Sequence, residues 1–167
     1  MTELHAAIAL AVLTFIFLCS FWLAPGGVLA LRRRAGGALQ VDVRLAYTPT
    51  TLYRLLDAYG PAGRRSFRTM LLADMVFPAI YGATLYLVAD LLTHGSAHAG
   101  SLGLVARAAA VAAAAFDYAE NIFLLHVLRH LDSRSGRSAR FAAICTTSKM
   151  IAFMVAAAAL ISAWLGV

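Results

Sequence analysis

The sequence predicts an all-α integral membrane protein: a four-helix transmembrane bundle with a short cytoplasmic amphipathic interfacial helix. Two observations predict this fold class. First, the chain of 167 residues is 62% hydrophobic and 13% charged, whereas soluble domains carry roughly 25% charged residues. Second, four apolar segments are long enough to cross roughly 30 Å of hydrocarbon as helices. No alternation typical of strands runs through these segments, so a transmembrane β-barrel is not expected.

The predicted spans cover residues 6–24, 69–93, 102–128 and 141–165 of a single transmembrane domain, residues 1–167. We expect the first segment to be a retained span. It lacks a basic n-region, and its apolar run is longer than the roughly 7–15 residues usual in a signal peptide. The third and fourth spans are rich in alanine. Small side chains let membrane helices approach closely, so these two spans are expected to pack against each other.

Basic residues lie on one side of the predicted spans. Arginines gather in the connector 32–68 and again in residues 129–140, whereas residues 1–5 and 94–101 contain no Lys or Arg. By the positive-inside rule, this asymmetry predicts a multi-pass protein of the cell inner membrane with both termini outside the cytoplasm. The same rule accounts for the net charge of +6, so we expect no nucleic-acid partner.

The connector contains one predicted helix, over residues 48–60. Thr48 suits its N-cap, Pro49 its first turn, and Gly60 with Pro61 its end. Its apolar residues repeat at i, i+3, i+4 and i+7 and so form one face. They are Leu52, Leu55, Leu56 and Tyr59. A short amphipathic helix between two spans is expected to lie in the cytoplasmic interface.

Three arginines follow this helix at the expected depth of the lipid phosphates: Arg64, Arg65 and Arg68. We interpret them as topology signals that contact anionic headgroups of membrane lipid. The alternative is a dedicated site for a phosphorylated substrate. Earlier in the connector, residues 39–47 alternate apolar and polar side chains. One strand without a partner does not make a sheet, so no sheet is predicted there.

Polar residues interrupt the third span. Asp117, Glu120 and Asn121 fall on one helical face, and ionisable groups inside a membrane usually pair or serve function. Glu120 and Lys149 each lie nine residues from a basic cytoplasmic end of their span, which is about 13 Å. Because consecutive spans with a short connector are antiparallel neighbours, we expect a Glu120–Lys149 ion pair.

Other polar side chains fall at a similar depth. Asp74 lies about 9 Å from the cytoplasmic end of its span, and Pro78 leaves a backbone carbonyl free close to it. Thr146 lies one turn from Lys149, and Tyr81 lies nearer the midplane. The candidate catalytic residues are Asp117, Glu120 and Lys149. The candidate substrate-binding residues are Asp74, Tyr81, Asn121 and Thr146.

Three carboxylates share this half of the bilayer with one lysine. Burial and like charge favour the neutral acid, so at least one is expected to hold its proton. An acid beside a carboxylate suits acid–base catalysis and proton-coupled transport. We therefore expect an enzyme or binding protein that acts on a hydrophobic, lipid-like substrate by proton transfer. The alternatives are a small proton-coupled transporter, a homo-oligomer or accessory subunit of a larger membrane complex, and a network that only locks helix register.

Two histidine pairs have the spacing of a helical metal site: His94 with His98, and His126 with His130. Gly95 and Ser96 favour a loop at the first pair, and cations at a helix C-terminus explain the second. The sequence contains no glycine-rich phosphate loop, no paired-cysteine metal motif and no nucleophile elbow. It therefore predicts no metal and no cofactor.

Two motifs, "LADMVFPAIYG" (72–82) and "FDYAENIFLL" (116–125), carry a resemblance. They resemble a set of small bacterial four-span membrane proteins with Asp-x-x-Phe-Pro in span two and Asp-Tyr-x-Glu-Asn in span three. The resemblance extends loosely over residues 47–150. It implies the four-helix fold and a shared polar site, and it implies no activity.

Overall fold

The computed structural model describes residues 2–93 and 97–166, and the described part is helical with no strand. Four of its helical segments are long and apolar enough to cross a membrane. The predicted all-α bundle is therefore confirmed. Its elements are α1 (Thr2–Leu23), α2 (Val28–Arg34), the 3₁₀ turn η1 (Val41–Val43), α3 (Pro49–Asp74), α4 (Phe77–Thr93), α5 (Ala97–Arg129), the 3₁₀ turn η2 (Leu131–Ser133) and α6 (Gly136–Leu165).

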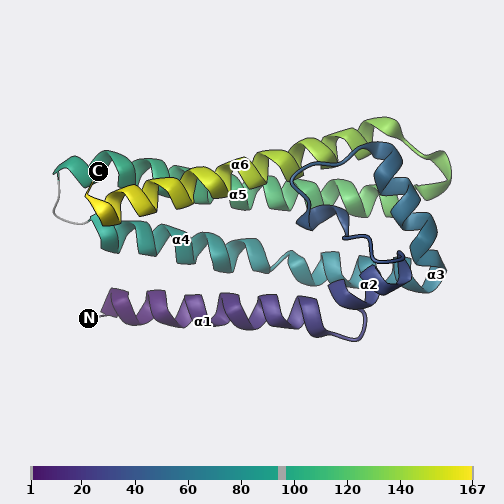
Figure 1. The fold of residues 1–167 in the computed structure, drawn as a ribbon, viewed down its shortest axis with the longest axis horizontal. Helices are drawn as coiled ribbons and strands as arrows, with labels where there is room; N and C mark the ends of the chain where they lie inside the picture. Colours follow the sequence, from purple (N-terminus) through teal and green to yellow (C-terminus); the bar gives the residue numbers. More distant parts are fainter. Residues whose placement is uncertain (1, 94–96, 167) are drawn as a thin grey trace.

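The long helices pack in the order α1, α4, α5 and α6 (Figure 1). Both chain ends lie at one end of the bundle, and α2 with the first half of α3 lies at the other (Figure 1). As predicted, α5 and α6 pack closely through small side chains, and Ala110, Ala113 and Ala156 are fully buried. In the described part of the chain, α1 packs along α4 but not along α6. The flank of the bundle between α1 and α6 therefore has no direct helix–helix packing.

The predicted connector helix forms the first half of α3. The Thr48 side chain accepts a hydrogen bond from the Thr51 backbone N–H at 3.2 Å, which is the expected N-cap. Gly60 has φ 61° and ψ −179°, a conformation that is open essentially to glycine alone. The axis bends there, and the chain continues as helix from Pro61 to Asp74.

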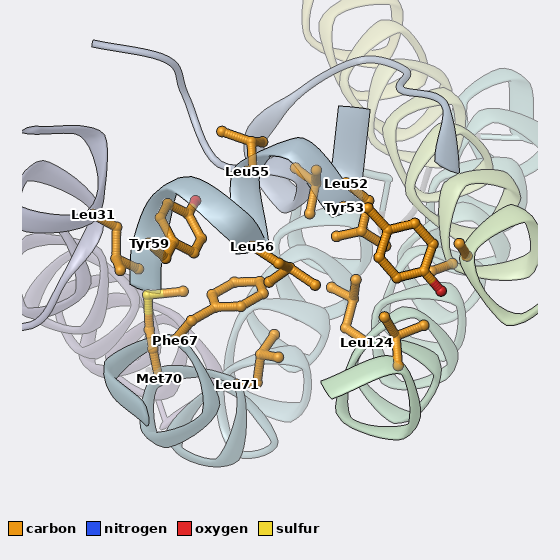
Figure 2. Close-up of a cluster of buried hydrophobic side chains, with 14 of the residues drawn as sticks. Leu31, Leu52, Tyr53, Leu55, Leu56, Tyr59, Phe67, Met70, Leu71 and Leu124 are labelled. Atoms are coloured by element: carbon orange, nitrogen blue, oxygen red, sulfur yellow. The ribbon is translucent and has the colours of Figure 1, made fainter. Parts of the chain in front are cut away.

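The apolar face of this first half is buried in protein. Leu52 and Leu56 are fully buried, and the cluster around them includes Phe67, Leu71 and Leu124 (Figure 2). Burial of each such side chain contributes about 1.5–3 kcal/mol. The first half of α3 therefore closes one end of the bundle, and its apolar residues pack on the second half of α3 and on α5.

The second predicted span, 69–93, is interrupted in the structure. α3 ends at Asp74, Met75 and Val76 form a turn, and α4 begins at Phe77. Pro78 has no N–H to donate to the carbonyl of Asp74, four residues earlier, so a continuous helix would lose that hydrogen bond. The interruption places Asp74 at a helix end inside the bundle.

Candidate functional site

Lys149 is the centre of a buried ionic cluster between α5 and α6. Its Nζ lies 2.7 Å from Oε2 of Glu120 and 3.0 Å from Oδ1 of Asp117. The relative exposure is 5% for Lys149, 0% for Glu120 and 4% for Asp117. The expected Glu120–Lys149 contact is confirmed, and the same lysine also holds Asp117.

Each of these carboxylates has a second donor. The Thr146 hydroxyl donates to Oε1 of Glu120 at 2.5 Å, and the Tyr81 hydroxyl donates to Oδ2 of Asp117 at 3.0 Å. Tyr81 comes from α4, so this bond ties a third helix to the cluster. Satisfying both oxygens offsets part of the cost of burying the charge.

Asp74 joins the site from the interruption between α3 and α4. The Asn121 amide donates to Oδ2 of Asp74 at 2.8 Å. Asn121 lies one turn along α5 from Asp117 and is fully buried. The structure therefore brings together all the residues that the sequence suggested for the intramembrane site: Asp74, Tyr81, Asp117, Glu120, Asn121, Thr146 and Lys149.

The connector adds two polar residues that sequence reasoning missed. Gln40 is 1% exposed, and its amide donates to Oδ2 of Asp42 at 2.8 Å. Nζ of Lys149 donates to the backbone carbonyl of Asp42 at 3.4 Å. Residues 39–47 thus fold back onto the bundle as an irregular segment with the turn η1. The sequence signal for this segment was the alternation of apolar Val41 with polar neighbours. Such alternation does not require that the segment belong to a sheet.

A cavity of about 380 Å³ extends from these polar groups toward α1. Small-molecule sites in proteins have volumes of about 300–1,000 Å³. The cavity has a polar end and mostly apolar walls, and it is not enclosed on every side. Its polar lining is Thr14, Gln40, Asp42, Asp74, Tyr81, Thr84, Asp117 and Lys149. Its apolar lining is Leu18, Phe21, Trp22, Val28, Val43, Met70, Phe77, Leu85, Met150 and Phe153.

The carboxylates outnumber the basic groups at this end of the cavity. Asp42, outside the spans, shows the effect: burial raises its pKa from 3.8 to about 6, Lys149 opposes the rise and Asp117 adds to it. Glu120 differs from the other acids because it lies behind Lys149 and does not line the cavity. Asp42, Asp74 and Asp117 are therefore the carboxylates that a molecule in the cavity would meet.

The three arginines that follow the connector helix, Arg64, Arg65 and Arg68, lie apart from the Lys149 cluster, on the second half of α3. Arg65 and Arg68 are exposed and Arg64 is partly buried. Arg65 lines a second hollow between α1 and α3, and Arg68 lines a third with Arg129. Within residues 2–93 and 97–166, none of the three forms an ion pair with the Lys149 cluster.

Within the described residues, the histidines form no metal centre. The rings of His126 and His130 lie 4.3 Å apart between centroids. The described residues contain no group of three or more His, Cys, Asp or Glu side chains arranged to hold a metal ion. His94 and the side chain of His98 lie outside the described residues.

The chain was compared with protein-family models, curated proteins and solved structures, and none of the three comparisons gave a match.

Proposed function

We propose that this protein is a membrane-embedded enzyme or binding protein for a hydrophobic, lipid-like molecule, which it handles by proton transfer. The observation that carries the proposal is the cavity itself. One end holds the Lys149–Asp117 ion pair, and the walls are aromatic and aliphatic. Such a site suits a molecule with a long apolar body and one reactive or polar end.

The route into the cavity favours entry from the bilayer. Leu18, Met150 and Phe153 line it from α1 and α6, and these two helices do not pack along each other in the described residues. A lipid-like molecule could pass between them without leaving the hydrocarbon. A water-soluble substrate would not be expected to enter through this flank, because the route passes through hydrocarbon.

Among the acids, Asp117 is the best candidate for proton transfer in this proposal. It lines the cavity, whereas Glu120 does not. Tyr81 and Lys149 each contact one of its oxygens, and so fix its orientation. Glu120 would then act as a positioning residue that holds Lys149. Isomerisation or cyclisation by proton transfer suits these groups better than hydrolysis, for which no activated nucleophile is present in the described site.

The proposal places the chain in the cell inner membrane with both termini outside the cytoplasm. Two observations support this orientation. The termini lie at one end of the bundle (Figure 1), and the arginine-rich residues 32–34 and 129–140 lie at the opposite end. The positive-inside rule assigns that basic end to the cytoplasm.

The test is to extract and identify the molecule that stays bound to the protein during purification. Wild type and two α1 variants would be purified gently, extracted with organic solvent and compared by mass spectrometry. Leu18→Trp fills the cavity, whereas Leu13→Trp changes an equally apolar α1 residue outside the lining. We expect one lipid-like species with wild type and Leu13→Trp and its loss with Leu18→Trp. Equal retention by all three would refute the proposal.

A small proton-coupled transporter is a second candidate, and the interruption at Asp74 favours it. Discontinuous helices are typical of transporter sites, and intramembrane carboxylates are typical of proton relays. Proteoliposomes with an internal pH dye would test this candidate. A substrate-dependent pH change that Asp74→Asn abolishes would favour transport. A stoichiometric protein that co-purifies with the chain would favour an accessory subunit instead.

A further inference from the structure

The polar end of the cavity has more negative groups than positive ones. Lys149 contacts the carboxylates of Asp117 and Glu120, so its charge is already shared between two acids. Asp42 and Asp74 accept hydrogen bonds from the neutral amides of Gln40 and Asn121. No salt bridge joins either of them to a basic side chain within the part of the chain that the structure describes. When both are ionised, this side of the cavity carries negative charge that no basic side chain of the described residues balances.

Hydrogen-bond donors are also missing. Oε1 of Gln40 is buried without a hydrogen-bond partner, and so is Oδ1 of Asp42. Both residues line the cavity, and Gln40 is 1% exposed. A buried acceptor that stays unpaired is unfavourable, because it has lost its hydrogen bonds to water without replacement. After a rotation of either side chain toward the cavity, a molecule that donates hydrogen bonds would remove this cost, whereas a molecule that only accepts them would not.

The walls next to these acceptors are aromatic. The rings of Phe21 and Phe77 lie 5.9 Å apart, those of Phe77 and Tyr81 lie 5.1 Å apart, and those of Tyr81 and Phe153 lie 4.9 Å apart. All four line the cavity. Aromatic faces attract organic cations and also cover an apolar body. A bare metal ion would use the acceptors but not these walls.

We infer that the cavity selects an amphipathic organic cation: an amine, protonated at its nitrogen, with an apolar body. Its N–H groups would donate to Asp42, Asp74 and Gln40, and its body would lie among the aromatic side chains toward α1. The inference rests on the proposed function, because both place a hydrophobic molecule in the cavity. It adds the charge and the donor character of that molecule.

Three probes with one apolar body separate charge from hydrophobicity: 4-phenylbutylamine, 4-phenyl-1-butanol and 5-phenylpentanoate. The protein would be placed in nanodiscs of phosphatidylcholine, which is zwitterionic with no net charge, so that the lipid surface does not concentrate the amine. Trp22 lines the cavity and reports binding by its fluorescence. The chain has 2 tryptophans, so Trp164→Phe leaves Trp22 as the single reporter.

We expect the amine to bind at least about tenfold more tightly than the alcohol, and the carboxylate not to compete. In Asp42→Asn/Asp74→Asn the preference for the amine over the alcohol should disappear. The control Asp132→Asn removes an exposed carboxylate on η2 and should leave the preference unchanged. The wild-type comparison of amine with alcohol stands even if the double variant does not fold.

Equal binding of amine and alcohol, or a preference that survives the double variant, would overturn the inference. In that case the proposed function would stand, because a hydrophobic molecule would still occupy the cavity. Binding of no probe would also overturn the inference. The extraction experiment with Leu18→Trp then decides the proposed function separately, since it makes no assumption about charge.

Discussion

Nζ of Lys149 lies 2.7 Å from Oε2 of Glu120, and this contact joins α6 to α5 inside the bundle. Removing one partner of a buried ion pair strands the other charge. Lys149→Met should therefore destabilise the detergent-solubilised protein by about 1–5 kcal/mol, the lower values applying to membrane proteins. Adding Glu120→Gln should restore part of the loss. Thermal unfolding of the two single variants and the double variant measures the coupling.

The exposed ion pair between Arg134 and Asp57, at 2.9 Å, is the matched control for this cycle. Water screens such pairs, which contribute about 0–1 kcal/mol. Arg134→Met should therefore change the unfolding temperature little. Strictly additive losses for Lys149→Met and Glu120→Gln would show that the buried pair does not couple the two helices.

The second prediction concerns the close approach of α4 and α5. A Cβ added at Gly103 would clash with the Thr93 side chain, whereas one added at Gly100 meets nothing within 4 Å. Overpacking costs about 1–3 kcal/mol, so Gly103→Ala should lower stability. Gly100→Ala should raise it slightly, because alanine favours helix. Unfolding of both variants under one condition checks the contrast, and a harmless Gly103→Ala would contradict it.

The third prediction is a pH dependence that comes from Asp42, whose pKa is raised from 3.8 to about 6 by burial. Between these values the folded chain binds more protons than the unfolded chain. The Asp42 contribution to the free energy of unfolding should therefore fall as the pH rises from about 4 to about 6. Asp42→Asn should weaken the gain in stability that wild type shows between pH 7 and pH 5.

Melting curves of wild type, Asp42→Asn and Asp132→Asn at several pH values would test this dependence. Asp132 is an exposed carboxylate on η2, so its removal should leave the pH profile unchanged. A profile that is the same for wild type and Asp42→Asn would assign the pH dependence to other groups.

The fourth prediction is the topology. Reporters that are active only in the cytoplasm should work when fused at Ala35 or Ser135 and should not work at Gly100, because the first two positions adjoin the arginine clusters. A reporter that requires export should give the reverse pattern. If Gly100 proved cytoplasmic, the proposed orientation would have to be reversed.

The fifth prediction separates a site from a scaffold. Asp117→Asn keeps an acceptor for the Tyr81 hydroxyl but cannot cycle a proton. We expect the variant to fold and to fail to complement a deletion strain at matched membrane abundance. Glu120→Gln, which does not alter the cavity lining, should retain partial function at matched abundance. Full complementation by Asp117→Asn would show that the polar network only stabilises the fold.

Much of the α5–α6 half could be predicted from the sequence. Glu120 and Lys149 lie at equal distances from the basic ends of two consecutive spans, so helical geometry alone places them side by side. The structure confirms that contact. Thr146 and Tyr81 followed from similar depth arguments. Such arguments succeed because a helix of known rise leaves few places where a buried charge can find a partner.

The connector could not be predicted in the same way. Gln40 and Asp42 belong to an irregular segment whose path has no fixed period, so their burial depends on how α2 and α3 close the end of the bundle. The full interruption after Asp74 was also missed. Pro78 signals a lost hydrogen bond, but proline in a membrane helix can produce either a kink or a break, and tertiary packing selects between them.

The sharing of Lys149 between two acids of α5 also bears on how the chain enters the membrane. A charged residue at the centre of a span adds roughly 2.5–3.5 kcal/mol to the free energy of insertion, and α5 carries two such residues while α6 carries their counterion. The short turn η2 (Leu131–Ser133) joins these helices. We therefore expect α5 and α6 to leave the translocon together as a hairpin in which Lys149 offsets one of the two acidic charges, and a chain that ends after α5 to insert poorly.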